Sequence, residues 1–194
     1  MFFLTKPNDK SLSAQAEAAA KQPDPDLGLP KAPAATAPGY HIDHAEYRLG
    51  TGLAAFESAR SALTQWRHYD QSWIRVCPLA PPIRVGTSFV VAARAFGAWS
   101  VNQCRIIEVV DDAGLVRRFG FVYRTLPRHV ERGDAMFVLE HRTADDSVWL
   151  IVHTVSRMNH WLPRLFTPLG RIAQRRARDT AAKTLRDFAS DQHA

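Results

Sequence analysis

The sequence lacks the features that mark disulfide-rich, membrane-spanning and nucleotide-binding proteins. Its 194 residues include only two cysteines, Cys77 and Cys104, without metal-ligand spacing, so we expect reduced, buried thiols in a cytoplasmic protein. No apolar run is long enough to cross a bilayer, and the opening Met-Phe-Phe-Leu is too short for a signal peptide. A Gly-rich phosphate loop, a G-x-S-x-G elbow and paired C-x-x-C motifs are also missing. We therefore expect no nucleotide or other cofactor.

The composition is that of an ordinary globular chain with an uneven charge. Apolar residues make up 46% and charged residues 23% of the sequence, which is enough to build one core without disulfides. The net charge is +6, and residues 157–194 alone hold eight Lys or Arg against three Asp. Such a segment either meets an anionic partner or forms a solvated helix face.

The first 38 residues differ from the rest because they hold six of the twelve prolines. The Ala-rich stretch Ser11–Gln22 predicts a short helix. The Pro-rich stretch after it cannot sustain helix or sheet, because proline lacks an N–H and fixes φ, so we interpret it as an extended lead-in. The sequence thus divides into an Ala/Pro-rich N-terminal extension, residues 1–38, and one domain, residues 39–190.

Periodicity within residues 39–190 predicts a mixture of strands and helices. A strand at Tyr40–Leu49 precedes a helix whose apolar residues recur from Leu53 to Trp66, with Thr51 as its N-cap. Later segments rich in β-branched and aromatic residues are joined by short connections, which imply antiparallel neighbours. These strands are Ser72–Cys77, Thr87–Phe96, Trp99–Val110, Leu115–Leu126, Ala135–His141 and Ser147–Arg157, the last four forming a meander.

Alternation along Leu115–Thr125 separates the two faces of the strand Leu115–Leu126. We expect one face to belong to the interior and the other to meet water. The interior set is Phe119, Phe121 and Tyr123, and the water-facing set is Arg118, Gly120, Val122 and Arg124.

The longest helical pattern ends the chain, at roughly His160–Ala189. Pro163 suits a first turn, whereas Pro168 and Gly170 predict a kink or a later start. The basic residues raise nucleic-acid or anionic-membrane binding as an alternative, but the apolar stripe is wide enough for a sheet to cover. We therefore expect the helix to close the core, with no nucleic-acid binding and with Arg175, Arg176 and Arg178 solvated. The predicted stripe is Leu162, Leu165, Phe166, Leu169, Ile172, Ala173, Ala177, Ala181, Leu185 and Phe188.

This layout resembles the helix-grip fold of the SRPBCC superfamily, which includes START-like lipid carriers and the birch-pollen-allergen group. Within it, the sequence is similar to an uncharacterised bacterial and plant family, domain of unknown function nineteen-ninety. The resemblance covers roughly residues 38–188 and rests on residues 39–52, 99–106, 119–134 and 168–185. It implies an α+β fold in which a curved antiparallel sheet wraps the long C-terminal helix. The resemblance to this family does not imply any established reaction.

The segment 119–134 is the most specific part of this resemblance. The family pattern reads roughly F-x-Y-G-T-L-P-G-H-x-E-x-G-E. Arg124 and Arg128 stand where it has glycines, and Asp134 replaces its final Glu. The matching residues are Tyr123, Thr125, Leu126, Pro127, His129, Glu131 and Gly133.

Two sets of residues are candidates for a functional site. An imidazole beside a carboxylate can act as a general base, so His129 and Glu131, near Tyr123 and Asp134, are candidate catalytic residues. Alternatively, these side chains satisfy loop amides. Large aromatic residues either fill the core or line a pocket between sheet and helix. The candidate ligand-binding residues are Trp66, Trp73, Phe89, Trp99, Phe121, Tyr123, Thr125 and Phe137.

A metal site is not expected from the histidines. His41 and His44 are three residues apart on a predicted strand, so their side chains face opposite ways and cannot share an ion. The leading hypothesis is therefore a helix-grip domain that binds a small apolar or amphipathic ligand. One alternative is a cyclase- or hydrolase-like enzyme using His129 and Glu131. Another is a structural or partner-binding domain without a cavity.

Overall fold

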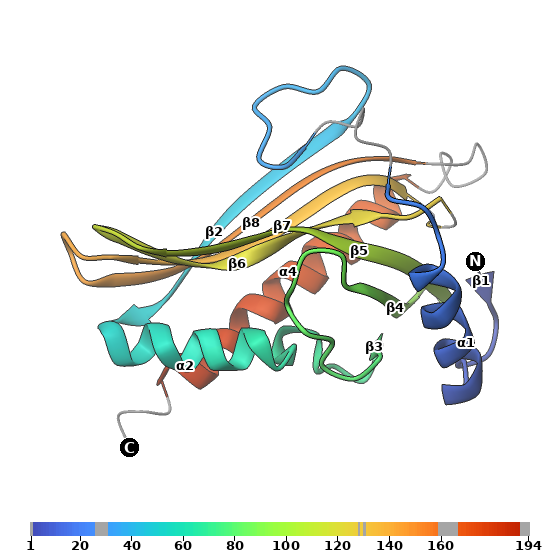
Figure 1. The fold of residues 1–194 in the computed structure, drawn as a ribbon, viewed down its shortest axis with the longest axis horizontal. Helices are drawn as coiled ribbons and strands as arrows, with labels where there is room; N and C mark the ends of the chain where they lie inside the picture. The colour runs from blue at the N-terminus through green and yellow to red at the C-terminus, as the bar shows by residue number, and fades with distance from the viewer. Residues whose placement is uncertain (1, 26–30, 128, 130, 159–166, 191–194) are drawn as a thin grey trace.

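One antiparallel sheet of eight strands forms the scaffold (Figure 1). The computed structural model describes residues 2–25, 31–127, 129, 131–158 and 167–190. Seven strands follow the order β2-β8-β7-β6-β5-β4-β3, and β1 pairs with β5. The predicted meander is confirmed, because β5 to β8 are neighbours in chain order. The strands are β1 (Phe2–Phe3), β2 (His41–Thr51), β3 (Ile74–Cys77), β4 (Ser88–Ala95), β5 (Ala98–Ala113), β6 (Val116–Thr125), β7 (Glu131–Arg142) and β8 (Ser147–Met158).

The helices cover the two faces of this sheet unequally. The helix α2 (Leu53–Thr64), the short 3-10 helix η1 (Arg67–Tyr69) and the long helix α4 (Thr167–Ser190) lie on one face, which we call the inner face (Figure 1). The helix α1 (Asp9–Ala20) packs against β4 and β5 on the opposite, outer face. A curved antiparallel sheet gripping the C-terminal helix is the predicted α+β helix-grip fold.

The main core lies between the inner face and the helices. Apolar side chains of α2, η1, the sheet and the second half of α4 pack there, among them Phe56, Leu63, Phe121, Leu150 and Leu185. These residues are almost completely buried. Removing them from water supplies much of the free energy of folding, at about 25 cal/mol per Å² of apolar surface.

The outer face is covered by residues from the N-terminal segment. Val122 was expected to meet water, but it is 1% exposed and packs in a cluster with Ala32, Ala37 and Val138. Arg124 is also 1% exposed. The prediction of a solvated face is therefore wrong here, because a distant segment lies on the strand.

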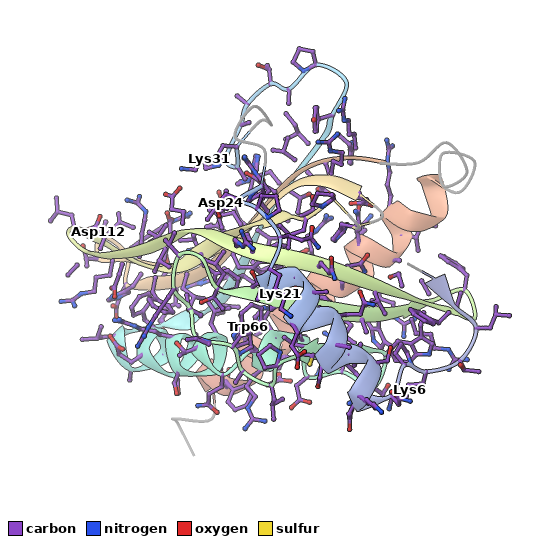
Figure 2. The ribbon with its side chains drawn as sticks, turned by 45° about the vertical axis from the view of Figure 1, so that its right-hand side comes forward. Lys6, Lys21, Asp24, Lys31, Trp66 and Asp112 are labelled. Carbon is purple, nitrogen blue, oxygen red and sulfur yellow. The ribbon has the colours of Figure 1, made fainter. Side chains whose placement is uncertain are left out.

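Arg105 ties the N-terminal segment to the same face. Its guanidinium donates to the carbonyl oxygens of Ala19 at 3.0 Å and Gln22 at 2.8 Å, and its Nη1 lies 2.9 Å from Asp24 Oδ1. Arg105 therefore caps the carboxyl end of α1, where the carbonyls lack helical partners. Figure 2 shows Asp24 and Trp66 on opposite sides of the sheet.

The helix boundaries confirm some predictions and correct others. The short N-terminal helix is present, capped by Asn8, whose Oδ1 accepts from the Ser11 N–H at 2.8 Å. Thr51 is not the N-cap of α2, because β2 runs through it and Gly52 takes the cap position without a side-chain bond. The later start of α4 is confirmed at Thr167, whereas Pro163 lies outside the described residues.

The apolar stripe of α4 differs from the predicted one. Ile172 is 60% and Phe188 is 38% exposed, so both were assigned wrongly to the buried face. The buried residues are Ala181, Ala182, Leu185 and Ala189. Among the described residues, no helix combines the length and apolar character needed to cross a membrane.

Candidate ligand-binding site

The strand register places polar side chains on one end of the inner face. Residues opposite each other on antiparallel strands point to the same side, so the pairings define rows across the sheet. One row is apolar and joins Val109, Phe121, Phe137, Val152 and Ala45. The next row lies two residues further along each strand, or three on β5, where a bulge intervenes. It joins Ile106, Tyr123, Ala135, Thr154 and Asp43. The inner face thus changes from apolar to partly polar within one row.

A third row continues the polar region toward the end of the sheet. It contains Thr125, Gly133, Ser156 and His41. Thr125 Oγ1 accepts from the Gly133 N–H at 3.0 Å. Gly133 has φ of 150°, and an added Cβ would lie 1.8 Å from the Val155 carbonyl oxygen, so the close strand approach requires glycine.

The first half of α4 faces these polar rows. Gln174 Nε2 donates to both carboxyl oxygens of Glu131 at 2.8 Å. Further along the helix, Arg178 forms an ion pair with Asp43, and Asp179 Oδ1 accepts from the Tyr47 hydroxyl at 2.7 Å. Arg178 is therefore not part of a solvated face, in contrast to the prediction. These contacts place α4 over β2 and β7.

Glu131 is a half-buried carboxyl with neutral partners. Burial raises the pKa of Glu131, and hydrogen bonds from Ser156 and Gln174 offset part of that rise. A carboxyl in such surroundings retains its proton to higher pH than an exposed one.

Two phenols meet beside this carboxyl. The hydroxyls of Tyr69 and Tyr123 lie 3.1 Å apart, joining η1 to β6. Burial raises the pKa of both hydroxyls, and the charge of Glu131 raises that of Tyr123 further. Both phenols therefore stay neutral at physiological pH and can donate a hydrogen bond.

His129 lies in the loop between β6 and β7. Its Nδ1 accepts from the backbone N–H of Glu131 at 2.9 Å. Burial lowers the pKa of His129 to about 3. A ring with that pKa is neutral and only a weak base near pH 7. The structure thus brings His129 and Glu131 together, but the imidazole bonds to the backbone amide of Glu131 and not to its carboxyl group.

His68 and Asn102 carry buried polar atoms that sequence reasoning missed. His68 is 0% exposed, and neither ring nitrogen has a hydrogen-bond partner among the described residues. Burial lowers the pKa of His68 to about 3. Asn102 faces inward from β5, and its Oδ1 is also buried without a hydrogen-bond partner among the described residues. No spacing or motif marks either residue.

Most of the predicted aromatic residues form one packed cluster. The Trp66 ring lies 4.7 Å from Phe89 and 5.0 Å from Phe121, between ring centroids. Tyr123 stacks on Phe137 at 6.3 Å. Trp66, Phe89, Phe121 and Phe137 are at most 5% exposed, so they fill the core beside the polar rows.

Two predicted tryptophans lie elsewhere. Trp73 is half-buried at the edge of the cluster, with the Arg176 guanidinium 5.2 Å from its ring centroid. Trp99 lies on the outer face, where it packs with Leu12 and Val101. Trp99 therefore does not share a site with the other aromatic residues.

The histidines of the sheet form a pair that was not predicted. His44 and His153 face each other on β2 and β8, with their Nδ1 atoms 3.3 Å apart. His153 Nε2 also accepts from the Ala34 N–H at 3.1 Å, on the outer face. Within the described ranges, no three His, Cys, Asp or Glu side chains gather as metal ligands.

The sequence is similar to one family of proteins over most of its length. The family described as Domain of unknown function (DUF1990) matches residues 25–184. A UPF0548 protein of Dictyostelium discoideum is 30% identical over 164 residues, covering 79% of this chain and 76% of its own. A UPF0548 protein of Deinococcus radiodurans is 34% identical over 148 residues, covering 71% of this chain and 73% of its own.

Solved structures with little sequence similarity share the architecture. The Zhui aromatase/cyclase from Streptomyces has a TM-score of 0.53 at 11% identity, covering 79% of this chain and 97% of its own. A protein from Thermus thermophilus has a TM-score of 0.52 at 13% identity, covering 79% of this chain and 100% of its own. The fold is therefore the helix-grip fold that these structures share, and the chain belongs to the DUF1990 family.

Proposed function

We propose that this chain binds a small apolar or amphipathic ligand between the polar rows of the inner face and the first half of α4. The observation that carries the proposal is the half-buried carboxyl of Glu131 beside the phenols of Tyr69 and Tyr123. A core that only fills space gains nothing from such groups, because burying them costs free energy. A site that orients the polar end of a ligand needs them.

The roles in this proposal follow from the geometry. Trp73 and the edge of the aromatic cluster contact the apolar part of the ligand. Tyr123 and Glu131 orient its polar end, and His129 stabilises the loop that holds Glu131 through its backbone amide. The name of the Streptomyces structure, aromatase/cyclase, supports a small-molecule site by analogy of fold only.

Native mass spectrometry and thermal denaturation test the proposal. The purified chain is screened against a panel of lipids, aromatic compounds and terpenoids. We expect at least one compound class to add mass to the native chain and raise its melting temperature, because a ligand that binds only the folded state stabilises it. If no compound binds, the chain is better described as a structural or partner-binding domain.

A second candidate function is catalysis by Glu131. Burial raises the pKa of Glu131, which is the direction that suits a general acid, whereas the pKa of His129 is too low for an efficient base. A cyclase- or hydrolase-like reaction would then show a rate that falls as pH rises through the pKa of Glu131. Turnover that survives Glu131→Gln would exclude this role.

A further inference from the structure

The polar atoms of the inner face suggest what kind of polar group the ligand carries. This inference rests on the proposed function and asks which chemistry its site accepts. A buried acceptor without a partner costs free energy until a donor reaches it. The polar end of the ligand can therefore be read from which atoms still need partners.

Asn102 is the first such acceptor. Its Nδ2 donates to Ser100 Oγ at 2.9 Å, which uses the amide nitrogen and leaves Oδ1 buried without a partner among the described residues. Asn102 lies two residues from Cys104, which pairs with Thr125 of the third row. Its oxygen therefore belongs to the polar end of the inner face.

Glu131 is an acceptor of a different kind, because both of its carboxyl oxygens already accept from Gln174. Its side-chain partners Gln174 and Ser156 are neutral donors, so its carboxylate charge is not balanced by either of them. A ligand hydroxyl or ammonium group could share this carboxyl. A ligand carboxylate or phosphate placed there would be repelled by it.

The phenol pair adds neutral groups to this end, and His68 lies next to Tyr69 and against Phe137 of the apolar row. Tyr69 and Tyr123 share one hydrogen bond between their hydroxyls, which leaves one of the two protons for another acceptor. The His68 ring is neutral and offers one donor and one acceptor. A ligand hydroxyl, which both donates and accepts, matches this set.

Arg178 is a cation that reaches the inner face from α4. It forms an ion pair with Asp43, although its Nε is buried without a partner in the described part of the chain. This Nε is a donor that still needs an acceptor, which a ligand hydroxyl can supply, whereas a ligand carboxylate would compete with Asp43 for the same guanidinium. Arg176, the neighbouring cation, is exposed and lies over the Trp73 ring.

We infer that the inner site selects a neutral or cationic ligand with a hydrogen-bond donor, a hydroxyl or an ammonium group, and rejects the matching carboxylate. The acceptors Asn102 and Glu131 receive the donor, and the aromatic edge at Trp73 contacts the apolar part. The discrimination arises from charge and hydrogen bonding, since the apolar part of the ligand can be the same in all cases.

Three naphthalene probes of equal size test this inference by isothermal calorimetry at pH 7. They are 2-naphthalenemethanol, 2-naphthalenemethylamine and 2-naphthoate, which carry a hydroxyl, an ammonium and a carboxylate. We expect the alcohol and the amine to bind at least about tenfold more tightly than the acid, the effect of one unfavourable charge contact. Tighter binding of 2-naphthoate overturns the inference but leaves the proposed site standing. Failure of all three to bind counts against both.

Two variants locate the discrimination. Glu131→Gln is expected to reduce the preference for the amine over the acid about tenfold, whereas Glu57→Gln on the exposed side of α2 leaves the preference unchanged. Asn102→Leu removes the orphaned acceptor, so it is expected to weaken binding of the alcohol without loss of folding. If Arg178→Gln and not Glu131→Gln changes the preference for the amine over the acid, the polar group of the ligand binds near Asp43 on β2 and the inference is wrong.

Discussion

Arg124 and Asp134 lie opposite each other on β6 and β7 and form a buried ion pair with two contacts. Arg124 Nε is 2.6 Å from Asp134 Oδ1, and its Nη2 is 2.8 Å from Oδ2. These are two of the three positions at which the sequence departs from the family pattern. The third, Arg128, lies outside the described residues. The guanidinium that replaces a glycine thus meets the carboxylate that replaces a glutamate.

This pairing predicts unequal effects of single and double substitutions. Arg124→Ala leaves Asp134 buried without its cation, so the free energy of unfolding should fall by about 3–5 kcal/mol. The double change Arg124→Leu with Asp134→Leu should cost much less, because no charge remains buried. Urea denaturation measures both. Lys183→Ala, in the exposed pair with Asp187, is the control and should change stability by less than about 1 kcal/mol. Equal losses in the single and double variants would contradict this account.

Gly133→Ala should prevent normal folding of the β7 end. The new Cβ would clash with the Val155 carbonyl oxygen, at 1.8 Å, and the φ of 150° disfavours any side chain. We expect a loss of more than about 3 kcal/mol or insoluble protein. Gly114→Ala is the matched control, because its Cβ would meet only the flexible Asp112 side chain. A Gly133→Ala protein with wild-type stability would show that the strands lie further apart than the structure places them.

His68 should make the fold sensitive to acid. Its pKa is lowered from 6.5 to about 3, so the unfolded chain binds a proton between these values that the folded chain does not. The contribution of His68 to the free energy of unfolding is therefore fully present above pH 6.5. It is lost as pH falls toward 3, and the loss is roughly 3 kcal/mol at pH 4. His68→Phe should remove this dependence, which denaturation at pH 4 and pH 7 would show. Parallel pH curves for the two proteins would mean that the ring finds a partner when protonated.

Glu131 should act in the opposite direction. Its folded pKa is raised above 4.5, so its stabilising contribution is complete below that pH and is lost as pH rises through the folded pKa. The free energy of unfolding of Glu131→Gln, measured relative to that of the wild type, should therefore be higher at pH 8 than at pH 4. Glu57→Gln provides the exposed comparison. A gain in stability on removing a carboxyl is typical of a group retained for function.

The strands and the helix-grip architecture could be predicted from the sequence because they follow from local patterns. The alternation in Leu115–Thr125 identified Phe121 and Tyr123 as interior residues, and both pack in the main core. The same alternation could not show that Val122 is buried, since it records the period of a strand and not which distant segment covers its other face. Trp99 could have been placed correctly, because alternation along β5 separates Trp99 and Val101 on the outer face from Cys104 on the inner face.

The candidate site was only partly predictable. Tyr123 and Glu131 were recognised from the family pattern, and the structure places them on one face beside Tyr69. His68 and Asn102 could not be identified, because orphaned polar atoms arise from packing between elements far apart in the chain. The stripe of α4 was misjudged at Ile172 and Phe188 because the helix turns its Leu185 face, and not theirs, toward the core.

Titration of 2-naphthalenemethanol into Trp73→Ala and Trp99→Ala tests the central claim most directly. Both variants remove one indole, but Trp73 borders the inner site and Trp99 packs against α1 on the outer face. The account predicts at least about tenfold weaker binding for Trp73→Ala and unchanged affinity for Trp99→Ala, even though the latter loses stability. Unchanged affinity in Trp73→Ala, or a loss confined to Trp99→Ala, would show that the ligand does not bind between the sheet and α4.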